Sequence, residues 1–454
     1  MLGSGMIEAL KCSSRTVRVP ESWADRFGWS SGDPIQIAAG KKTVSASIDV
    51  DDKEQIAFSC DILWELKLPR IPVTWKVKKK SIRLGPFVAV YCQHTGSSEK
   101  PFSSITALLE DMTKLSRGLC IPFYVISIGG FHQDTKTVTC WNYEEKFNRW
   151  REAEFPWPDF CIKKIMTVPR MLRLIARRDI QLMRMSKCRM LYRPLGSKLK
   201  VYHILSQHAS IVPHLPETSK ISSLDDVLMF LKTYPLLYIK PSRGTQGRSV
   251  YRVSRLPEPG MVQIQFRRGD QKRKATIQLT ENRTWFSKKF LSDREFLVQQ
   301  GIHLTKDRQG RSADFRWLMQ KDGLGQWNIT ARVARLGQKG SITTNVSTGA
   351  DVLAVDEFLE RAGFSPKQIP SVIDQMDALA VQIVRILEDH VGPLGELGID
   401  FGLDRTGHPW LIEVNPNPGR KMLKILDPEV RALSLRRPLE YARYTAGFSD
   451  ISPG

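Results

Sequence analysis

The sequence predicts a multidomain protein of mixed α+β and α/β class, with domains at residues 1–82, 83–195 and 196–454. Its 454 residues are enough for roughly three domains of ~150 residues each. Strand-like and helix-like segments alternate in the middle of the chain, which is typical of α/β domains. The C-terminal part mixes hairpins with helices, which indicates an α+β domain. "IPSVIDQMDALAVQIVRILEDHV" is a predicted long amphipathic helix, and its apolar face holds Ile373, Met376, Leu379, Ala380, Ile383, Ile386 and Leu387.

Residues 1–82 are expected to form a small β-rich domain. The stretch "SSRTVRVPESWADRFGWSSGDPIQIAAGKKTVSASI" contains short apolar runs separated by the turn sequences "SSGDP" and "AAGKK". A small helix is expected near residues 20–27. The stretch holds no cluster of catalytic side chains, so the chemistry is expected elsewhere.

The middle domain is expected to be α/β. "GPFVAVYC" and "IPFYVISIGGF" are predicted strands, and "PFSSITALLEDMTKLSRGL" between them is a predicted helix. The longest uncharged stretch, "GLCIPFYVISIGGF", is shorter than the ~20 residues of a membrane helix and is broken by Gly and Pro. We therefore expect no membrane partner.

The chain is strongly basic. Its 68 Lys and Arg against 47 Asp and Glu give a net charge of +21, which favours phosphate-rich partners. The excess concentrates at residues 163–200, where twelve Lys or Arg accompany one acid, Asp179. Two interpretations stay open for this segment: a solvated basic surface, or a site for nucleic acid or another polyanion.

Cysteine usage favours a reducing compartment. Seven cysteines are scattered without a CxxC pair, and the start of the chain lacks a basic region followed by an apolar one. The expected location is the cytoplasm.

The segment "GIDFGLDRTGHPWLIEVNPNPG", residues 398–419, predicts a hairpin with three oxygen ligands on one face. Ile399, Phe401 and Leu403, then Trp410, Ile412 and Val414, alternate with other residues, as in strands with one buried face. "DRTGHP" supplies the turn. The remaining face carries two carboxylates and an amide, which suit Mg²⁺: Asp400, Glu413 and Asn415. The alternative is a hairpin with a polar solvent face.

A second group of residues predicts an anion site. In "YPLLYIKPSRGTQGRSVYRV" a strand ends at Lys240, and a loop with Gly244 and Gly247 leads to another strand. Glycine allows backbone N–H groups to approach an anion, and Ser242 and Thr245 add hydroxyl donors. The pattern differs from a Walker A loop, because GxxxxGK[ST] is absent and a strand follows the loop.

Three further strands are predicted after this loop. "REFLVQQGIHL" is an apolar strand that ends in Gln299, Gln300 and Gly301, and such an end offers backbone groups to a planar ring. "SADFRWLMQ" and "WNITARVARLG" pair through the turn "KDGLGQ" and carry Arg316 and Arg332. Arginines placed beside a metal site suit stabilisation of a transferring phosphoryl group. Core packing and surface exposure are the competing explanations.

The order of these segments resembles the ATP-grasp superfamily over residues 196–420, chiefly through the D-x12-E-x-N hairpin. "LPET", "YIKPSRGTQGRSVYRV", "ADFRWLMQ" and "EVNPNPG" are similar, more narrowly, to the YheC/YheD endospore coat-associated family. That family carries such a module after N-terminal regions of this kind. The resemblance implies a C-terminal ATP-grasp fold preceded by an α/β pre-ATP-grasp domain and the small β domain.

The resemblance also implies a role for each matched residue. Lys200, or alternatively Lys198, would hold the α and β phosphates of ATP with Lys240. The loop residues would close over the triphosphate: Ser242, Gly244, Thr245 and Gly247. Gln299, Gln300 and Ile302 would meet adenine. Arg316 and Arg332 would approach the γ-phosphate as catalytic residues, and one or two Mg²⁺ ions would be held by Asp400, Glu413 and Asn415. The acid that often holds the ribose hydroxyls is not evident in "QQGIHLTKD".

The implied activity is an ATP- and Mg²⁺-dependent ligase that joins a carboxylate to an amine or thiol through an acyl-phosphate. Its acceptor would be a small molecule or a peptide, selected by residues before 196 and by the loop "QKGSITTNVSTGAD". Two alternatives stay open: a structural, spore-coat-associated protein that binds nucleotide without ligation, and a polyanion-binding protein that uses residues 163–200. Spore coat proteins are further expected partners.

Overall fold

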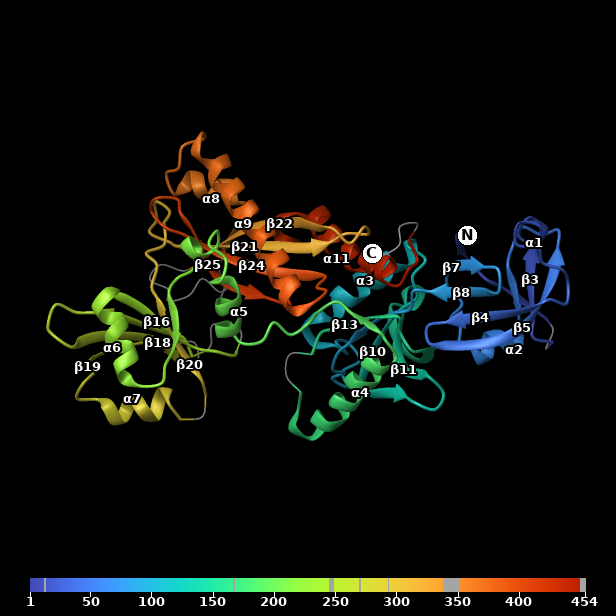
Figure 1. Cartoon of the computed structure of the whole chain (residues 1–454), viewed down its shortest axis with the longest axis horizontal. Helices are drawn as coiled ribbons and strands as arrows, with labels where there is room; N and C mark the ends of the chain where they lie inside the picture. Colours follow the sequence, from blue (N-terminus) through green and yellow to red (C-terminus); the bar gives the residue numbers. More distant parts are fainter. Residues whose placement is uncertain are drawn as a thin grey trace. The chain divides into compact units, whose positions relative to one another are not determined.

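The fold is described from a computed structural model that covers residues 1–11, 14–165, 168–244, 249–268, 271–292, 294–337 and 351–449 (Figure 1). Its contacts divide the chain into two compact units. The first comprises Met1–Tyr192, Lys321–Gln326 and Ala432–Gly454, and the second comprises Arg193–Gln320 and Trp327–Arg431. The expected boundary at 195/196 lies near the start of the second unit, whereas the one at 82/83 lies inside the first.

The N-terminal part of the first unit is β-rich, as predicted. An eight-stranded sheet has the order β1-β7-β8-β4-β5-β3-β6-β2. Its strands are β1 Leu2–Gly5, β2 Glu8–Leu10, β3 Thr16–Pro20, β4 Pro34–Ala39, β5 Lys42–Asp51, β6 Ala57–Ser59, β7 Val73–Lys78 and β8 Ser81–Gly85. Two short helices accompany the sheet: α1 Glu21–Phe27 and α2 Cys60–Glu65. The helix predicted near residues 20–27 is therefore present.

The second sheet of this unit is α/β, with the order β12-β11-β10-β9-β13-β14. Strand β9 pairs in parallel with β10 and with β13, and β13 pairs in parallel with β14. The helices that join these parallel strands are α3 Thr106–Gly118 and α4 Arg173–Met185. The strands are β9 Val88–Tyr91, β10 Phe123–His132, β11 Thr137–Glu144, β12 Arg149–Pro156, β13 Phe160–Lys163 and β14 Arg189–Met190.

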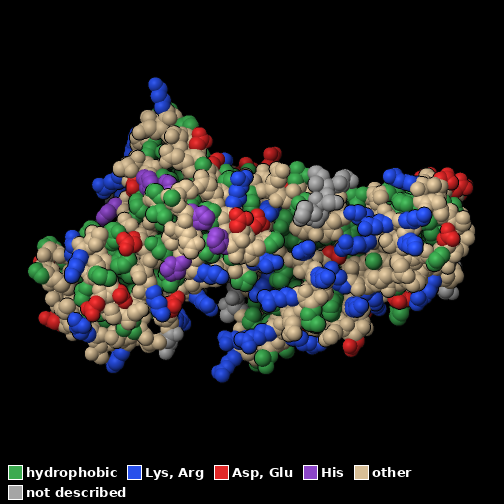
Figure 2. All heavy atoms as spheres, in the orientation of Figure 1, with side chains coloured by type: hydrophobic (Ala, Val, Ile, Leu, Met, Phe, Trp, Pro, Cys, Tyr) green, Lys and Arg blue, Asp and Glu red, His purple; other side chains and the backbone are tan. Residues whose placement is uncertain are grey.

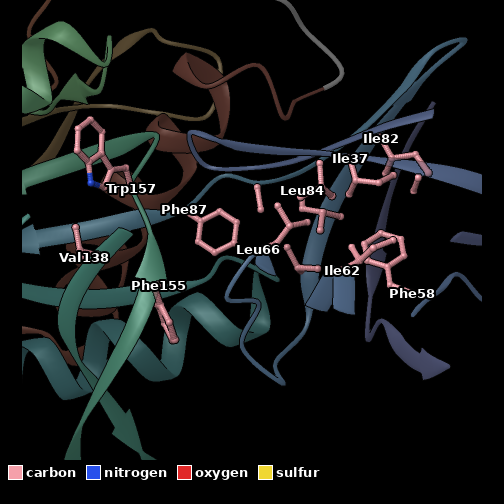
Figure 3. Close-up of a cluster of buried hydrophobic side chains, with 14 of the residues drawn as sticks. Ile37, Phe58, Ile62, Leu66, Ile82, Leu84, Phe87, Val138, Phe155 and Trp157 are labelled. Carbon is pink, nitrogen blue, oxygen red and sulfur yellow. The ribbon is translucent and has the colours of Figure 1, made fainter. Parts of the chain in front are cut away.

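One hydrophobic core runs through both sheets of the first unit (Figure 3). Ile37, Ile82 and Leu84 of the eight-stranded sheet belong to the same buried cluster as Val138 and Phe155 of the α/β sheet. Because burial of apolar surface is the main favourable term in folding, a shared core makes the two parts one compact unit. This continuity explains why residue 82 does not end a unit.

The C-terminal helix α11, Pro428–Thr445, packs mainly in the first unit. Leu435, Leu439 and Ala442 are buried in a cluster with Phe160 of β13 and Leu191. The segment after residue 431 therefore does not group with the rest of the expected 196–454 domain, because its apolar side chains are buried against the α/β sheet.

The second unit contains two sheets. One has the order β15-β20-β16-β17-β18-β19 and buries one face against α6 and α7 (Figure 1). Its strands are β15 Thr218–Lys220, β16 Leu236–Pro241, β17 Tyr251–Arg255, β18 Met261–Arg268, β19 Gln271–Gln278 and β20 Phe296–Gln300. Helices α6 Leu224–Thr233 and α7 Arg283–Phe290 belong to this part, whereas α5 Lys198–Leu205 buries Ile204 and Leu205 in the core of the other sheet.

The other sheet has the order β23-β22-β21-β24-β25 and is covered on one face by α8 and α9. Its strands are β21 Ala313–Lys321, β22 Trp327–Leu336, β23 Asp351–Leu353, β24 Glu396–Leu403 and β25 Pro409–Asn415. The helices are α8 Val355–Arg361, α9 Gln368–Val391 and α10 Leu423–Leu426. As the sequence predicts, α9 buries an apolar stripe that includes Met376, Leu379, Ile383 and Leu387.

The predicted hairpin is formed by β24 and β25, but its alternation is interrupted. Asp400 pairs with Glu413, whereas Phe401 pairs with Leu411, so one extra residue of β25 forms a β-bulge. Leu411 therefore packs in the core in place of Ile412, which lies beside Gly402 on the opposite face. The expectation that Ile412 faces the core is wrong, because the bulge shifts the strand period by one residue.

Within the described residues, no helix combines the length and apolarity needed to span a bilayer. The six cysteines in the described ranges are free.

Candidate functional site

The candidate site lies in the second unit, on polar faces of its two sheets. In β16 and β20, Ile239 and Val298 point into the apolar core with α6 and α7, so Lys240 and Gln299 point the other way. In the other sheet the core faces α8 and α9, which leaves Asp400 on the opposite face. The period of two in the strands therefore places both polar sets.

The centre of the second polar face is a buried network of two arginines and two aspartates. Arg316 lies opposite Asp400 in the β21–β24 pair and binds it with two hydrogen bonds, from Nε to Oδ1 and from Nη2 to Oδ2, the latter 2.7 Å long. Arg335 of β22 lies 3.1 Å from Asp400 Oδ1 and also binds Asp314 through Nε at 2.7 Å. All four residues are less than 10% exposed.

Gly398 makes room for this network. A Cβ atom at this position would lie 3.2 Å from Cδ and Nη1 of Arg316 and 3.0 Å from Cβ of Pro418. The absence of a side chain at Gly398 thus leaves room for the Arg316 side chain beside β24.

The electrostatics of the network are those of a tightly paired set of charges. Burial alone would raise the pKa of Asp400, but Arg316 and Arg335 outweigh burial and hold the pKa below its usual range. Burial alone would lower the pKa of Arg335, and Asp400 and Asp314 reverse that effect and raise the pKa. Asp400 is therefore ionised with both of its oxygens bound to arginine.

Arg332 lies on the other face of the sheet, so it is not beside Arg316 as the expected pair of catalytic arginines requires. Its guanidinium binds both carboxylate oxygens of Asp377 on α9. Arg332 and Arg335 are three residues apart on one strand, so they face opposite sides. The pairing with Arg316 falls to Arg335, which we did not predict; the odd spacing in "ARVAR" was the signal that could have found it.

Lys198, rather than Lys200, points into the site. Its Nζ donates to Glu413 Oε1 at 2.5 Å and to the Gly244 carbonyl at 3.0 Å. Lys200 is exposed and lies beside Gly196. Lys198 and Lys200 are two positions apart on α5, so their side chains point in directions that differ by about 200° around the helix axis. Only one of these lysines can therefore face the site.

Lys240 is tied to Gln299 and is electrostatically coupled to Lys198 and Glu413. Its Nζ donates to Gln299 Oε1 at 2.7 Å, and Gln299 Nε2 donates to Thr218 Oγ1 at 2.8 Å. Burial lowers the pKa of Lys240 to about 8; Glu413 acts to raise this pKa, and Lys198 lowers it further. The two polar atoms of the Gln299 side chain are thus bound to Lys240 and to Thr218, rather than left for a ring.

Glu413 and Asn415 lie on the same face of β25, as the sequence predicts. Asn415 pairs with Gly398, two residues along from the Asp400–Glu413 pair. Asn415 Oδ1 accepts a hydrogen bond from the Asn417 backbone N–H at 3.1 Å. The side-chain oxygens of Glu413 and Asn415 are of the type that Mg²⁺ prefers and lie on one face of β25, whereas the oxygens of Asp400 are bound to arginine. In the described ranges, no group of three or more His, Cys, Asp or Glu is placed to hold a metal ion.

The other predicted contacts are placed in part. Ser242 is buried, and its carbonyl accepts the Lys198 N–H at 2.9 Å at the start of α5. Gly244 has a φ of +138°, a backbone conformation that favours glycine. Gln300 binds the Glu217 backbone through its own N–H and its Oε1, and the Ile302 carbonyl accepts the Leu304 N–H. Thr245 and Gly247 lie outside the described residues, as does the expected acceptor loop over 338–350.

The chain is similar to one protein family and to two bacterial proteins. Residues 187–445 match the model of a family described as YheC/D like ATP-grasp. Endospore coat-associated protein YheD of Bacillus subtilis (strain 168) is 28% identical over 421 residues, which cover 88% of this chain and 88% of that protein. Endospore coat-associated protein YheC of the same organism is 28% identical over 320 residues, 70% of this chain and 86% of that protein.

Among solved structures, D-alanyl-alanine synthetase A from Vibrio cholerae aligns with a TM-score of 0.46 and 14% identity. The alignment covers 78% of this chain and 98% of that one. The family model itself spans more than half of the sequence and includes the whole candidate site. The chain therefore belongs to the YheC/D-like ATP-grasp family.

Proposed function

We propose that this protein is an ATP- and Mg²⁺-dependent ligase that joins a carboxylate to an amine or a thiol through an acyl-phosphate. The observation that carries the proposal is that two cationic sets of one unit are linked through Glu413, which binds Lys198 and pairs across the strands with Asp400. Lys198 and Lys240 come from α5 and β16, and Arg316 and Arg335 lie on the polar face of the other sheet, with Glu413 in contact with Lys198. Phosphate groups are the ligands that such a set of lysines and arginines attracts.

Each cation would have a separate task. Lys240 and Lys198 would hold the phosphates nearest the nucleoside as point charges, and Lys198 would exchange Glu413 for phosphate oxygen. Arg316 and Arg335 would neutralise charge on the phosphoryl group in transfer, because their planar guanidinium groups are already oriented by Asp400 and Asp314. The protein would then act mainly by positioning and electrostatics, as is usual for phosphoryl transfer.

Glu413 and Asn415 would hold Mg²⁺, with Asp400 as a further oxygen only if an arginine releases it. The ion, when bound, would neutralise phosphate oxygens of ATP. Ile302 and its neighbours after β20 would meet the adenine through backbone groups. Within this proposal Arg335 replaces Arg332 as the second catalytic arginine, since Arg332 binds Asp377 on the opposite face.

Release of ADP tests the proposal. The purified chain is incubated with Mg²⁺-ATP and a panel of carboxylates, amines and short peptides, and coupled ADP formation is recorded. We expect ADP release that depends on both a carboxylate and an acceptor. ATP binding by calorimetry without ADP release for any pair would reject the ligase.

The second candidate is a structural protein that binds nucleotide without ligation. It is favoured by one observation, which is that Asp400 is bound by two arginines and Glu413 by a lysine. Acids neutralised in this way would leave Mg²⁺ weakly held. The relatives' names point to the same setting, so we propose the cytoplasm, with association to the spore coat, as the site of action.

Lys198→Ala is expected to weaken ATP binding, whereas Lys200→Ala is not. Loss of one charged hydrogen bond costs ~1.5–3 kcal/mol, and Lys198 is the lysine that faces Glu413. Calorimetry of both variants gives the comparison, with Lys200→Ala as the matched control on the same helix. A larger loss in Lys200→Ala would return the role to Lys200.

ATP affinity should fall as the pH is raised through the pKa of Lys240. Burial sets this pKa at about 8, so above that value the side chain loses the charge that attracts phosphate. The decrease is limited to about tenfold per pH unit for one proton. Calorimetry of the native chain and of Lys240→Arg, which stays charged, separates this effect: the variant should show a flat profile.

The free energy of unfolding should depend on pH in the opposite direction to the ATP affinity. Because the pKa of Lys240 in the folded protein lies below its ordinary value of 10.5, the unfolded chain binds more protons between about 8 and 10.5. The contribution of Lys240 to the free energy of unfolding without ligand therefore rises across that range. Equal pH profiles for the native chain and Lys240→Met, in stability and in ATP affinity, would contradict the buried charge.

A further inference from the structure

Helix α4 and the 3₁₀ turn before it, Arg170–Leu172, carry a concentration of exposed apolar side chains. Met171, Leu174, Ile175 and Met185 are 84%, 75%, 40% and 66% exposed. They are four of the twelve large hydrophobic side chains that the described residues expose, and they lie within fifteen consecutive positions. Single exposed hydrophobic residues are normal on a protein surface, but a group of them indicates a contact surface.

Leu174 and Met185, the most exposed apolar side chains of α4 itself, do not serve the packing of the helix. Ala176, Leu182 and Met183 form the buried face of α4. On the outward face Leu174, Arg178, Gln181 and Met185 follow one another at spacings of four, three and four, which places them on one stripe. The core of the first unit is thus complete without the outward apolar residues.

The outward surface of α4 and its flanks is cationic and free of acids. Asp179, the one acid between Lys163 and Lys200, is buried, where it accepts hydrogen bonds from Tyr91 Oη at 2.8 Å and from the Gly129 N–H at 2.7 Å. The exposed cations are Arg170, Arg173, Arg177, Arg178, Arg184, Lys187 and Arg189. Figure 2 shows blue side chains with green ones among them at the lower edge of the view, where α4 lies in Figure 1.

The combination selects among polyanions. Nucleic acid would bind the cations through its phosphate groups, but this binding does not require exposed Leu, Ile and Met side chains. An anionic bilayer accepts both, because acyl chains take up the apolar side chains while headgroup phosphates meet the arginines. We propose that α4 docks this protein on an anionic phospholipid surface, by lying on it rather than crossing it. The expectation of no membrane partner rested on the lack of a spanning segment, which does not bear on such a surface contact. The proposal is independent of the ligase activity.

Co-sedimentation of the whole chain with vesicles tests the docking. We expect binding to vesicles that contain phosphatidylglycerol, little binding to pure phosphatidylcholine, and weaker binding as salt is raised. The double variants Leu174→Ser/Met185→Ser and Arg177→Gln/Arg178→Gln should each weaken binding by on the order of tenfold or more. Since these side chains are exposed, thermal unfolding should be unchanged.

Matched controls lie in the second unit. Met229→Ser on α6 removes a side chain that is 62% exposed, a fraction similar to the 66% of Met185. Lys272→Gln/Lys274→Gln removes two exposed cations from β19. Both should bind vesicles as the native chain does. Vesicle binding that survives Leu174→Ser/Met185→Ser would overturn the proposal. So would duplex DNA binding tighter than vesicle binding and insensitive to that apolar double variant, which would assign the surface to nucleic acid.

Discussion

Asp400→Asn should lower the free energy of unfolding by about 3–5 kcal/mol, since removal of one partner leaves buried charge uncompensated. Arg316 and Arg335 are only 6% and 4% exposed, and both bind the Asp400 carboxylate. An amide of the same size keeps the volume but removes the negative charge. Chemical denaturation of the ligand-free protein measures the loss directly.

Asp351→Asn provides the matched control for this variant. Asp351 also binds an arginine, Arg311 at 3.0 Å, but its side chain is 70% exposed. An exposed pair contributes only about 0–1 kcal/mol, so the control should unfold almost as the native chain does. Equal stability of Asp400→Asn and the native chain, combined with lost Mg²⁺-ATP binding, would instead make Asp400 a metal ligand with no structural role.

Glu413→Gln should strongly lower the rate of ADP release while the fold is retained. The substitution removes the acid proposed to hold Mg²⁺, and a preorganised charged group of this kind is typically responsible for ~10²–10³-fold in rate. It also removes the negative charge that raises the pKa of Lys240, so Lys240 loses its proton at lower pH. Mg²⁺-ATP calorimetry and ADP release, compared with the native chain, give the two readouts.

The stability of Glu413→Gln distinguishes a site residue from a structural one. Glu413 is 32% exposed and binds Lys198 at the edge of the sheet, so its loss should change the free energy of unfolding by about 0–1 kcal/mol. Glu357→Gln on α8, which breaks an exposed pair with Arg361, is the control. Unchanged Mg²⁺-ATP affinity in Glu413→Gln would remove Glu413 from the proposed metal site.

Local periodicity was sufficient for much of the second unit. The alternation around Ile399, Phe401 and Leu403 predicted β24, and the apolar stripe predicted α9. The same period placed Glu413 and Asn415 on one face of β25, opposite Asp400. These features follow from the chain itself, because side-chain direction repeats every two residues in a strand and every 3.6 in a helix.

Other features needed contacts between distant parts of the chain. A one-residue bulge moved Leu411 into the core, and a shared apolar cluster joined the β-rich and α/β parts into one unit. Neither leaves a local mark in the sequence, because each depends on which neighbouring surface is available for burial.

The sequence by itself determined the family, the order of the elements and the set of polar residues from which a site could be built. Only the tertiary structure decided which of them meet. Lys198 binds Glu413 across 215 positions, and Arg316 binds Asp400 across 84. Neighbouring Lys200 and Arg332 have the same side-chain chemistry but point elsewhere. An ion pair depends on distance and on which face a side chain takes, and these are set by the packing of the two sheets.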